Sequence, residues 1–512
     1  MPLPSLDIFE KMRGLYTPVT DIRRRVLIEV ARMIQADRPP SHVEAIPFEI
    51  ISKNTPTYRD CVFKERAVVR ERVRLAFGLD LKEFGAHAPI LDDMAPAIVA
   101  AKVIAEPLVS VIKIGCERCP EKSYIVSDCC MGCIAHPCVP VCPTKAVSMV
   151  RGRSFIDQSL CIRCGRCMQV CPYNAILYRE RPCAAACGVN AIRSDAEGFA
   201  DIDYARCVSC GLCIVSCPFG AIAEKSEIVQ VIRSLKEAAA GGPPVWGEIA
   251  PSIAGQFGPL ATPGAIVAAL GKLGFAGAVE VAYGADIAIG EEGARLAALC
   301  AEAAAGREAG FVGTSCCPAW ALAARRNHPR LAANISDSWT PMVETAKKIK
   351  AGDPRARVVF IGPCVAKKVE CFQPAVASMV DFVMTFEELA ALFKAADIDP
   401  ADMGSAADPA DATTAGRSYP VAGNVAAVIL ARAHRISGAI GDIPHQSADT
   451  LRDCLSVLKK IEDHQFDTHP LLVEGMACPY GCIGGPGTLA PLKRAKAEVT
   501  AFANKAPRAA PE

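Results

Sequence analysis

The first part of the chain mixes charged and apolar residues at helical spacing. The segments DIRRRVLIEVARMI (21–34) and RAVVRERVRLAFG (66–78) place apolar side chains every three or four positions among arginines and glutamates. This periodicity predicts amphipathic helices that each bury one face. We therefore expect residues 1–115 to form a charged, helical N-terminal module.

Short apolar runs alternate with alanine-rich helical patterns in the C-terminal half. A helical segment (224–240) and a Gly-Pro turn mark the entry to this region. The alternation predicts an α/β domain over residues 226–495, with parallel sheets flanked by helices. Residues 496–512 are expected to form a C-terminal tail. The strand candidates are VWGEIA (245–250), GAVEVAY (277–283), GFVGT (310–314) and ARVVFIG (356–362).

Composition narrows the class of protein. The 512 residues are 51% hydrophobic, and at about 150 residues per domain they suggest roughly three to four domains. The net charge of +1 argues against nucleic-acid binding, which normally needs a basic excess. Charged residues interrupt the best apolar run (95–115), and the N-terminus lacks the apolar core of a signal peptide. We expect a cytoplasmic protein without a transmembrane segment.

Cysteines dominate residues 116–225. Of the 26 cysteines, 17 lie between Cys116 and Cys217. A disulfide scaffold would be short and secreted, so dense, regular thiols in this chain indicate metal sites. Two runs read C-x2-C-x2-C-x3-C-P, the spacing of bacterial ferredoxins, in which the fourth cysteine binds the other cluster of a pair. The runs are Cys161, Cys164, Cys167 and Cys171, and Cys207, Cys210, Cys213 and Cys217.

The first run has a partner upstream that follows the same design with a two-residue insertion. Crossed ligation then predicts two [4Fe–4S] clusters. His136 lies inside the upstream loop and is interpreted as a loop residue, because four thiolates already complete each cluster. The predicted ligand sets are Cys130, Cys133, Cys138 and Cys171, and Cys161, Cys164, Cys167 and Cys142.

The second run has an incomplete partner. Cys183 and Cys187 match the last two positions of a ferredoxin half-motif, and Cys116 and Cys119 are the unassigned pair nearby, leaving Cys129 over. We infer that this pair supplies the missing ligands, although it could instead bind zinc or remain empty. The α+β ferredoxin-like domains would then hold three to four clusters. The two further sets are Cys207, Cys210, Cys213 and Cys187, and Cys116, Cys119, Cys183 and Cys217.

Three cysteine motifs stand apart in the C-terminal half. They read TSCCPAW (314–320), PCVAKKVE (363–370) and EGMACPYGCIGG (474–485). No G-x-G-x-x-G follows a strand and no P-loop occurs, so a nucleotide site is not indicated. The three motifs, in this order behind a ferredoxin-like region, resemble the signatures of the [FeFe]-hydrogenases. The resemblance covers about residues 116–495, and the Gly-Pro-Cys motif with the charged N-terminal module is similar to the group B branch.

This resemblance implies an H-cluster at the centre of the domain, a [4Fe–4S] cubane joined to a di-iron unit with CO, cyanide and dithiolate ligands. Cys316 would be the first proton relay, and a thiol that titrates near ~8.5 suits that role. Lys367 and Ser252 would donate hydrogen bonds to cyanide, and Met476 would line the di-iron pocket. The implied cubane ligands are Cys317, Cys364, Cys478 and Cys482, the last of them bridging.

The implied proton route departs from the better-known members. Glu292 and Ser336 match its first two positions beyond Cys316, but Arg295 occupies the place of the second glutamate, and arginine cannot be deprotonated in a protein. Protons would leave through water or Glu291, or turnover would be slow. Gly362 and Met342 also replace a methionine and a glutamine found near the di-iron unit in many members.

The expected function is reversible conversion of protons and electrons to H2. A ferredoxin-like carrier would exchange the electrons, dedicated maturation proteins would supply the di-iron unit, and a larger redox complex is possible. Two alternatives stay open. One is a sensor of H2 or redox state with low turnover, and the other is an iron–sulfur electron-transfer or assembly protein that lacks the di-iron unit.

Overall fold

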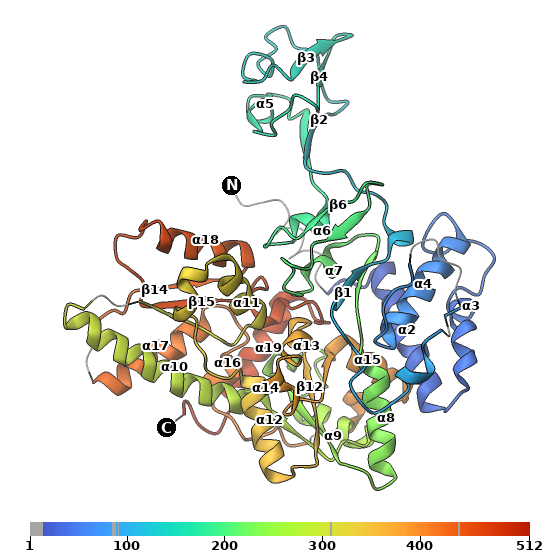
Figure 1. Cartoon of the computed structure of the whole chain (residues 1–512), viewed down its shortest axis with the longest axis vertical. Coiled ribbons are helices and arrows are strands. Elements are labelled where there is room, and N and C mark those ends of the chain that lie inside the picture. Colours follow the sequence, from blue (N-terminus) through green and yellow to red (C-terminus); the bar gives the residue numbers. More distant parts are fainter. Residues whose placement is uncertain are drawn as a thin grey trace.

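The computed structural model describes residues 14–83, 89–90, 92–307, 310–404, 406–438 and 441–511. The first 13 residues, on which the signal-peptide argument rests, lie outside this range, as does the last residue of the expected tail. A broad main body carries a narrow unit that projects from one side (Figure 1). No helix in the described ranges has the length and apolar character needed to cross a bilayer.

The N-terminal module is helical, as the periodicity predicts. Thr17 caps α2, because its side chain accepts a hydrogen bond from the Thr20 amide, and Pro18 occupies the first turn. The apolar face of α2 packs in one core with α8 and α15 of the following region. The helices are α2 (Pro18–Gln35), α3 (Ile46–Ile50) and α4 (Val62–Ala76), with 3-10 turns η1 (Pro40–Glu44) and η2 (Ala95–Ala97).

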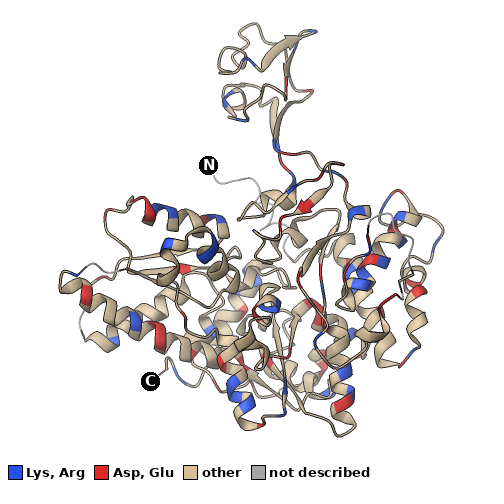
Figure 2. Cartoon of the chain, viewed as in Figure 1, with Lys and Arg blue, Asp and Glu red and all other residues tan. Residues whose placement is uncertain are grey.

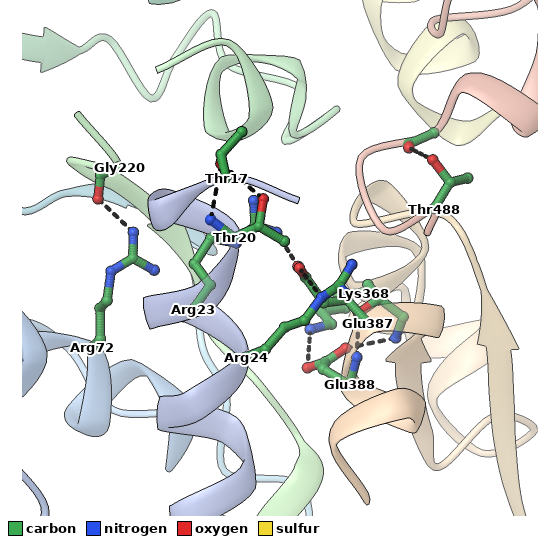
Figure 3. Close-up of polar contacts among 12 residues, drawn as sticks. Thr17, Thr20, Arg23, Arg24, Arg72, Gly220, Lys368, Glu387, Glu388 and Thr488 are labelled. Atoms are coloured by element: carbon green, nitrogen blue, oxygen red, sulfur yellow. Dashed lines mark hydrogen bonds and ion pairs between the residues drawn. The ribbon is translucent and has the colours of Figure 1, made fainter. Parts of the chain in front are cut away.

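A buried ion pair joins this module to the C-terminal domain (Figure 3). Arg23 on α2 pairs with Glu387 on α15 (Phe386–Ala395), and the Arg24 Nε donates to the same carboxylate at 3.2 Å. Beside it, the fully buried Lys368 Nζ lies 2.9 Å from Glu388. The two contacts to Glu387 fix α2 against a helix that lies more than 350 residues later in the sequence.

Two ferredoxin-like units are nested in the cysteine-rich region. Strand β1 (Val109–Val111) pairs with β8 (Ile222–Glu224), and between them β2 (Ser123–Val126) pairs with β5 (Ile176–Arg179), both antiparallel. The inner unit therefore interrupts the outer one. Each unit also carries one hairpin and short helices: β3 (Val147–Val150), β4 (Arg153–Ile156) and α5 (Arg166–Gln169) in the inner unit; η3 (Lys113–Gly115), α6 (Pro182–Ala185), β6 (Ile192–Ser194), β7 (Ala200–Ile202) and α7 (Leu212–Ser216) in the outer.

Two parallel sheets organise the C-terminal domain. The order of the first is β10-β9-β12-β13 and that of the second is β11-β15-β14. All pairs are parallel, as predicted for an α/β domain. The strands are β9 (Val245–Ile249), β10 (Gly277–Glu280), β11 (Val312–Gly313), β12 (Arg357–Gly362), β13 (Phe382–Thr385), β14 (His445–Ala448) and β15 (Leu472–Gly475).

Helices flank both sheets. The longest, α10, packs against α12 and α17. The helices besides α15 are α8 (Ile228–Ala239), α9 (Pro263–Leu273), α10 (Val281–Ala304), α11 (Pro318–Asn327), α12 (Pro341–Gly352), α13 (Ala366–Glu370), α14 (Pro374–Ala377), α16 (Thr414–Ser418), α17 (Asn424–Ser437), α18 (Leu451–Glu462) and α19 (Leu492–Asn504), with 3-10 turns η4 (Pro251–Ile253), η5 (Pro329–Asn334), η6 (Pro400–Met403) and η7 (Cys482–Gly484).

Two details differ from the sequence expectation. The strand expected over 277–283 ends at Glu280, where α10 begins. The tail expected from residue 496 is largely helical, because Val499 and Phe502 bury an apolar stripe of α19. Beyond that helix, the carbonyl of Arg508 accepts a hydrogen bond from the Thr414 amide.

Candidate functional site

Four cysteines of the ferredoxin-like units share one local geometry. Each precedes a tight turn, and its Sγ accepts a hydrogen bond from the amide of an alanine four residues later. A thiolate that receives such bonds is stabilised. The pairs are Cys142 with Ala146, Cys171 with Ala175, Cys187 with Ala191 and Cys217 with Ala221, at 3.2, 3.4, 3.2 and 3.3 Å. Cys187 thus has the geometry of a closing ligand although no proline follows it.

The opening C-x-x-C pairs share a second geometry. In each, the residue before the second cysteine adopts a left-handed backbone: Arg118, Gly132, Arg163 and Ser209 have φ of 49°, 57°, 61° and 50°. This turn directs two thiols to the same side of the loop. The Sγ atoms of Cys116 and Cys130 also accept equivalent hydrogen bonds of 3.4 Å from the second strand of their unit's hairpin. Cys116 and Cys119 therefore begin the outer unit as Cys130 and Cys133 begin the inner one.

The ligand set that the sequence left most open comes together in the structure: Cys116, Cys119, Cys183 and Cys217. Burial raises the pKa of Cys183 to about 12, with further contributions from Cys217, Cys116 and Cys119. One small cavity is lined by all four of these cysteines. Buried Arg181 closes it, with its Nη2 2.8 Å from the Cys119 carbonyl. Within the described ranges no three of these thiols come close enough to hold a single ion such as zinc, so the set fits a cubane, in which each thiolate binds a different iron.

The second outer set lies beside the C-terminal motifs. Burial raises the pKa of Cys210 well above its ordinary value, and Cys187, Cys207 and Cys317 add to the shift. Burial also raises the pKa of Cys213, and the other three cysteines add to that shift. The set of Cys187, Cys207, Cys210 and Cys213 therefore adjoins Cys317, the first of the implied H-cluster ligands.

The inner unit brings its cysteines around one apolar core. Cys138, Cys142, Cys161, Cys167 and Cys171 contact this core, which Tyr124 also joins. Cys130 and Cys138 are linked through Ser154, whose amide donates to the first and whose hydroxyl lies 3.6 Å from the second thiol. The crossed ligand assignment within this unit stays a prediction.

The four implied H-cluster ligands converge between the two sheets. Cys317 is the N-cap of α11, Cys364 follows β12, and Cys478 and Cys482 lie on the loop after β15. Burial raises the pKa of all four thiols, and Cys317 and Cys364 contribute to the shift of Cys482. Within the described ranges, no three His, Cys, Asp or Glu side chains converge on a single metal ion. A cubane instead binds each thiolate to a different iron.

A buried carboxyl lies next to the predicted relay thiol. Glu292 on α10 is fully buried and accepts hydrogen bonds from the amide and hydroxyl of Ser315, at 2.9 and 3.0 Å. Burial raises the pKa of Glu292 to about 7, partly offset by hydrogen bonds from Ser315 and Ser336. Its charge in turn raises the pKa of Cys316, after burial. Cys316, Glu292 and Ser336 therefore form one contiguous group.

The next position of the predicted proton route holds an arginine where a carboxylate was expected. Arg295 is exposed, and its Nη2 donates to the Ala333 carbonyl at 3.0 Å. Glu291, the alternative considered, is also exposed, whereas its neighbour Glu292 is buried. The buried group of Cys316, Glu292 and Ser336 therefore ends at Ser336. The contacts of Arg295 and Glu291 within the described part of the chain do not connect it to the surface.

Lys367 lies in a buried polar group. Its Nζ is 2.7 Å from Glu370 Oε2, and Thr340 donates to Glu370 Oε1 at 2.5 Å. Glu248 on β9 lies within electrostatic range of Lys367, and burial raises its pKa well above the ordinary value. Neither carboxyl oxygen of Glu248 has a hydrogen-bond partner. Sequence reasoning missed Glu248, which lies four residues before Ser252 in the strand candidate 245–250.

The remaining predicted residues fit a bulky ligand. Ser252 is fully buried, and its hydroxyl has no hydrogen-bond partner, an arrangement that costs free energy unless a ligand accepts the bond. Met476 is buried in one core with Cys316. An added Cβ at Gly362 would lie 2.4 Å from the Phe360 ring, so that ring takes space that a methionine side chain would need. Met342, in place of a glutamine, is fully buried.

Tyr419 is a second residue that sequence reasoning missed. It follows α16, shares a core with Cys316 and Met476, and its buried hydroxyl has no hydrogen-bond partner. Burial raises its pKa well above the ordinary value, and Glu292 and Cys316 add to the shift. No motif flanks Tyr419, so its position beside the thiol follows only from the packing of α16 against α10.

The comparisons with known families agree with this site. Residues 244–486 match the C-terminal domain of the iron only hydrogenase large subunit. Residues 155–177 match a 4Fe-4S binding domain, and residues 177–228 match the LdpA Fe-S cluster-binding domain. These matches make residues 244–486 similar to the iron only hydrogenases and the cysteine-rich region before them similar to iron–sulfur cluster-binding domains.

Individual proteins that resemble this chain are also described as hydrogenases. Iron hydrogenase 1 of Clostridium pasteurianum is 28% identical over 398 residues, covering 69% of this chain and 68% of its own. The NADP-reducing hydrogenase subunit HndD of Solidesulfovibrio fructosivorans is 29% identical, covering 65% of this chain and 56% of its own. A solved [FeFe]-hydrogenase structure is 20% identical with a TM-score of 0.46, covering 56% of this chain and 91% of its own. The chain is therefore similar to the [FeFe]-hydrogenases over its C-terminal domain and carries a ferredoxin-type iron–sulfur region before it.

Proposed function

We propose that this chain interconverts H2 with protons and electrons at an H-cluster, in the manner of a group B [FeFe]-hydrogenase. The observation that carries the proposal is the buried Glu292 carboxyl, which lies next to Cys316 and beside the four implied ligand thiols. A purely electron-transferring protein needs the four thiols but has no use for a buried acid with a pKa of about 7. The location would be cytoplasmic.

When bound, the H-cluster would supply redox chemistry and an open iron position for hydrogen. Cys317, Cys364, Cys478 and Cys482 would hold it, while the Ser252 hydroxyl and the Lys367 ammonium would donate hydrogen bonds to its anionic ligands. Glu370 keeps Lys367 charged, because it raises the pKa of that ammonium against the effect of burial.

Protons would move between the Cys316 thiol and the Glu292 carboxyl. A carboxyl that titrates near 7 can both accept and release a proton at neutral pH, which is the condition for efficient proton transfer. Ser336 would extend the route by one hydroxyl. Beyond it, water in place of a carboxylate would carry the proton past Arg295.

Electrons would pass through the outer and then the inner ferredoxin-like unit. The set that contains Cys210 adjoins Cys317, and the set that contains Cys183 adjoins Cys213 of the first. Four [4Fe–4S] clusters would then lead outward to a ferredoxin-like carrier. Maturation proteins would supply the di-iron unit, and a larger redox complex could include the chain.

A sensor of H2 or redox state is the second candidate. The cation at Arg295, hydrogen-bonded to the Ala333 carbonyl, favours it because an interrupted proton route would slow turnover. The same clusters would then report their state to another protein through the N-terminal module.

The decisive experiment is infrared spectroscopy of anaerobic protein matured with the di-iron machinery, followed by H2 evolution with reduced ferredoxin. Metal-bound CO and cyanide bands with rapid evolution would support the enzyme, and the same bands with slow evolution would support the sensor. A Cys316→Ala variant should keep the bands and lose turnover, while Cys129→Ala, at the exposed thiol left outside every set, should keep both. Absence of the bands in protein with full iron and sulfide would reject both candidates in favour of an electron-transfer or assembly protein.

A further inference from the structure

The N-terminal module packs against the outer ferredoxin-like unit through helix α4. Two residues of this helix, Val68 and Leu75, share an apolar core with Ile112 and Ala223 of the outer unit. Positive and negative side chains are mixed along the helices of the module (Figure 2). The packing brings two arginines of the module to the loops that carry one predicted cluster. We call the ligands of this cluster the Cys183 set: Cys116, Cys119, Cys183 and Cys217.

Arg72 of α4 reaches the loop that follows Cys217. Its Nη2 donates a hydrogen bond to the Gly220 carbonyl (Figure 3). The next amide, that of Ala221, donates to the Cys217 sulfur at 3.3 Å. Gly220 has a φ of 58°, and an added Cβ there would lie 2.9 Å from Val19 and 3.3 Å from the Arg72 Nη2. The glycine therefore permits the close approach of the guanidinium group to the ligand loop.

The charge of Arg72 is buried, and no ion pair neutralises it within the described ranges. Only 6% of the residue is exposed, and its Nε has no hydrogen-bond partner. Burial lowers the pKa of Arg72 to about 10, with a smaller contribution from Arg23. Glu224, Cys217 and Glu387 oppose that shift. The guanidinium group is therefore charged at neutral pH, and a buried cation costs free energy unless an anion lies nearby.

Arg59 contacts the same loops without adding an unpaired charge. Its Nη2 donates to the Gly115 carbonyl at 3.2 Å and to the Phe219 carbonyl. Its Nη1 lies 3.0 Å from Glu117, whose carboxylate offsets the positive charge. Arg72 is therefore the arginine of this contact whose field is least compensated.

The predicted cluster would supply the anion that Arg72 lacks. Four thiolates give a [4Fe–4S] cluster a net negative charge, and reduction adds one electron to it. A fixed cation nearby stabilises the reduced form more than the oxidised form. The reduction potential of the cluster rises as a result, and burial limits the screening of this effect by salt.

We propose that Arg72, and through it the N-terminal module, raises the reduction potential of the cluster held by the Cys183 set. In each turnover the cluster gains one electron from its donor and passes one electron on, and Arg72 neither takes nor releases a proton. Arg72 is a positioning residue, because it touches the ligand loop and not the cluster. The inference rests on the accessory cluster of the proposed function and not on its di-iron unit.

A purely structural role is the alternative, and Arg74 provides the comparison. It lies on the same helix, is 3% exposed, and donates to the carbonyls of Asp80, Ile90 and Asp92 at 2.9, 3.1 and 2.8 Å. The charges that act on it are carboxylates of its own module. Arg74 therefore holds a loop in the way that Arg72 does, but away from the Cys183 set.

The test is a potentiometric titration of the full-length, cluster-loaded protein, followed by electron paramagnetic resonance. A Cys119→Ser variant identifies the signal of the cluster, because a serine ligand perturbs the cluster that it binds. In Arg72→Gln, the equilibrium constant for reduction of this cluster should fall by about tenfold, which lowers the midpoint by about 59 mV for one electron. The other midpoints should stay in place.

The matched control is Arg74→Gln. Both variants should lower the temperature of unfolding, but Arg74→Gln should change the equilibrium constant for reduction by less than about twofold. Arg72→Lys keeps the charge, so its midpoint should lie closer to wild type than that of Arg72→Gln. If Arg72→Gln cannot hold the cluster, Glu224→Gln tests the same balance of charge. Removal of this carboxylate, which faces Arg72, should raise the midpoint.

Three results would overturn the proposal. One is an equal shift of the midpoint in Arg72→Gln and Arg74→Gln, which would assign the effect to packing. Another is an unchanged midpoint in Arg72→Gln, or in Glu224→Gln where the first variant loses the cluster. The third is the absence of any signal that responds to Cys119→Ser, because Arg72 would then have no cluster to act on. None of these readouts depends on H2 evolution, so failure of the proposed function is distinguishable.

Discussion

Glu292 links burial to chemistry at the scale of one residue. Burial raises its pKa from 4.5 to about 7, so the carboxyl holds a proton below neutral pH and loses it above. Proton delivery to Cys316 requires the protonated form. We therefore expect H2 evolution to fall as pH rises through about 7 and Glu292→Gln to reduce turnover by at least about 100-fold.

Infrared difference spectra between wild type and Glu292→Gln would check this pKa. The protonated carboxyl band that the variant lacks should disappear with a midpoint near 7. Glu227, whose pKa burial also raises to about 7, contributes equally to both samples and cancels. Glu291→Gln, at the exposed neighbour, should leave band and turnover unchanged. A midpoint near 4.5 would contradict the burial argument.

Ser252 allows a second prediction at this scale. Its hydroxyl has no partner in the protein, so Ser252→Ala should change the free energy of unfolding by less than about 1 kcal/mol. In matured protein the same change should shift a cyanide stretching band. Ser234→Ala is the control, because that buried hydroxyl donates to the Gln230 carbonyl at 2.9 Å, within α8. If both variants leave the cyanide bands unchanged, the donor role of Ser252 is wrong.

Single residues also show the limits of sequence reasoning. Cys316 and Glu292 could be proposed because each lies in a recognisable motif. Glu248 and Tyr419 could not, because their significance comes from complete burial without a partner, which depends on packing between distant segments. The sequence shows that Gly362 stands where many members have a methionine. The reason is visible only in the structure, where the Phe360 ring occupies the space that a side chain would need.

At the scale of the element, helix α10 provides a matched pair of glycines. A Cβ at Gly284 would lie 2.1 Å from the Pro341 carbonyl oxygen of α12, whereas a Cβ at Gly290 would meet nothing within 4 Å. Gly284→Ala should therefore destabilise the domain by about 3 kcal/mol or more. Gly290→Ala should stabilise it by roughly 0.5–1 kcal/mol.

Thermal unfolding of the two variants, with equal cluster content, would measure the difference. The sign should be opposite in the two proteins. Equal destabilisation would mean that helix propensity and not the close approach of α12 governs both positions.

Elements were predictable where periodicity was strong. The helices α2, α4 and α8 and the strands β9 and β12 fall where the pattern indicates them. Strands β13, β14 and β15 were not proposed, since four-residue runs without clear alternation are hard to distinguish from other buried segments. The sequence analysis assigned most of helix α19 to a tail. The helix has only a short apolar stripe, and a loop with two prolines precedes it.

At the scale of the whole molecule, Glu387 holds the N-terminal module against the C-terminal domain. It pairs with buried Arg23 and receives a second hydrogen bond from Arg24 (Figure 3). Glu387→Gln removes the charge that both guanidinium groups face, so docking of α2 should weaken by about 3 kcal/mol. The pair of Glu29 and Arg32 on the same helix is more exposed, and Glu29→Gln should cost less than about 1 kcal/mol.

Hydrogen exchange of the α2 amides would measure this difference. Faster exchange in Glu387→Gln than in Glu29→Gln is the expected order. The reverse order would show that apolar packing alone holds the module in place.

The nested arrangement of the two ferredoxin-like units explains a feature that looked defective in the sequence. The half-motif at Cys183 and Cys187 lacks an opening pair, and the pair predicted for it, Cys116 and Cys119, lies before the inserted unit. Spacing identified the four cysteines as the remaining set, but the reason for their separation is the strand pairing of β1 with β8 around β2 and β5.

This nesting has a consequence for how the molecule could be altered in evolution. The inserted segment begins and ends on adjacent antiparallel strands, so its two ends lie next to each other. It could be lost or exchanged without separating Cys119 from Cys183, and the remainder would keep both predicted ligand sets of the outer unit beside the C-terminal domain. On the proposed function, one exchangeable segment would set the length of the electron relay and its outermost cluster, and the proposed site in the C-terminal domain would stay unchanged.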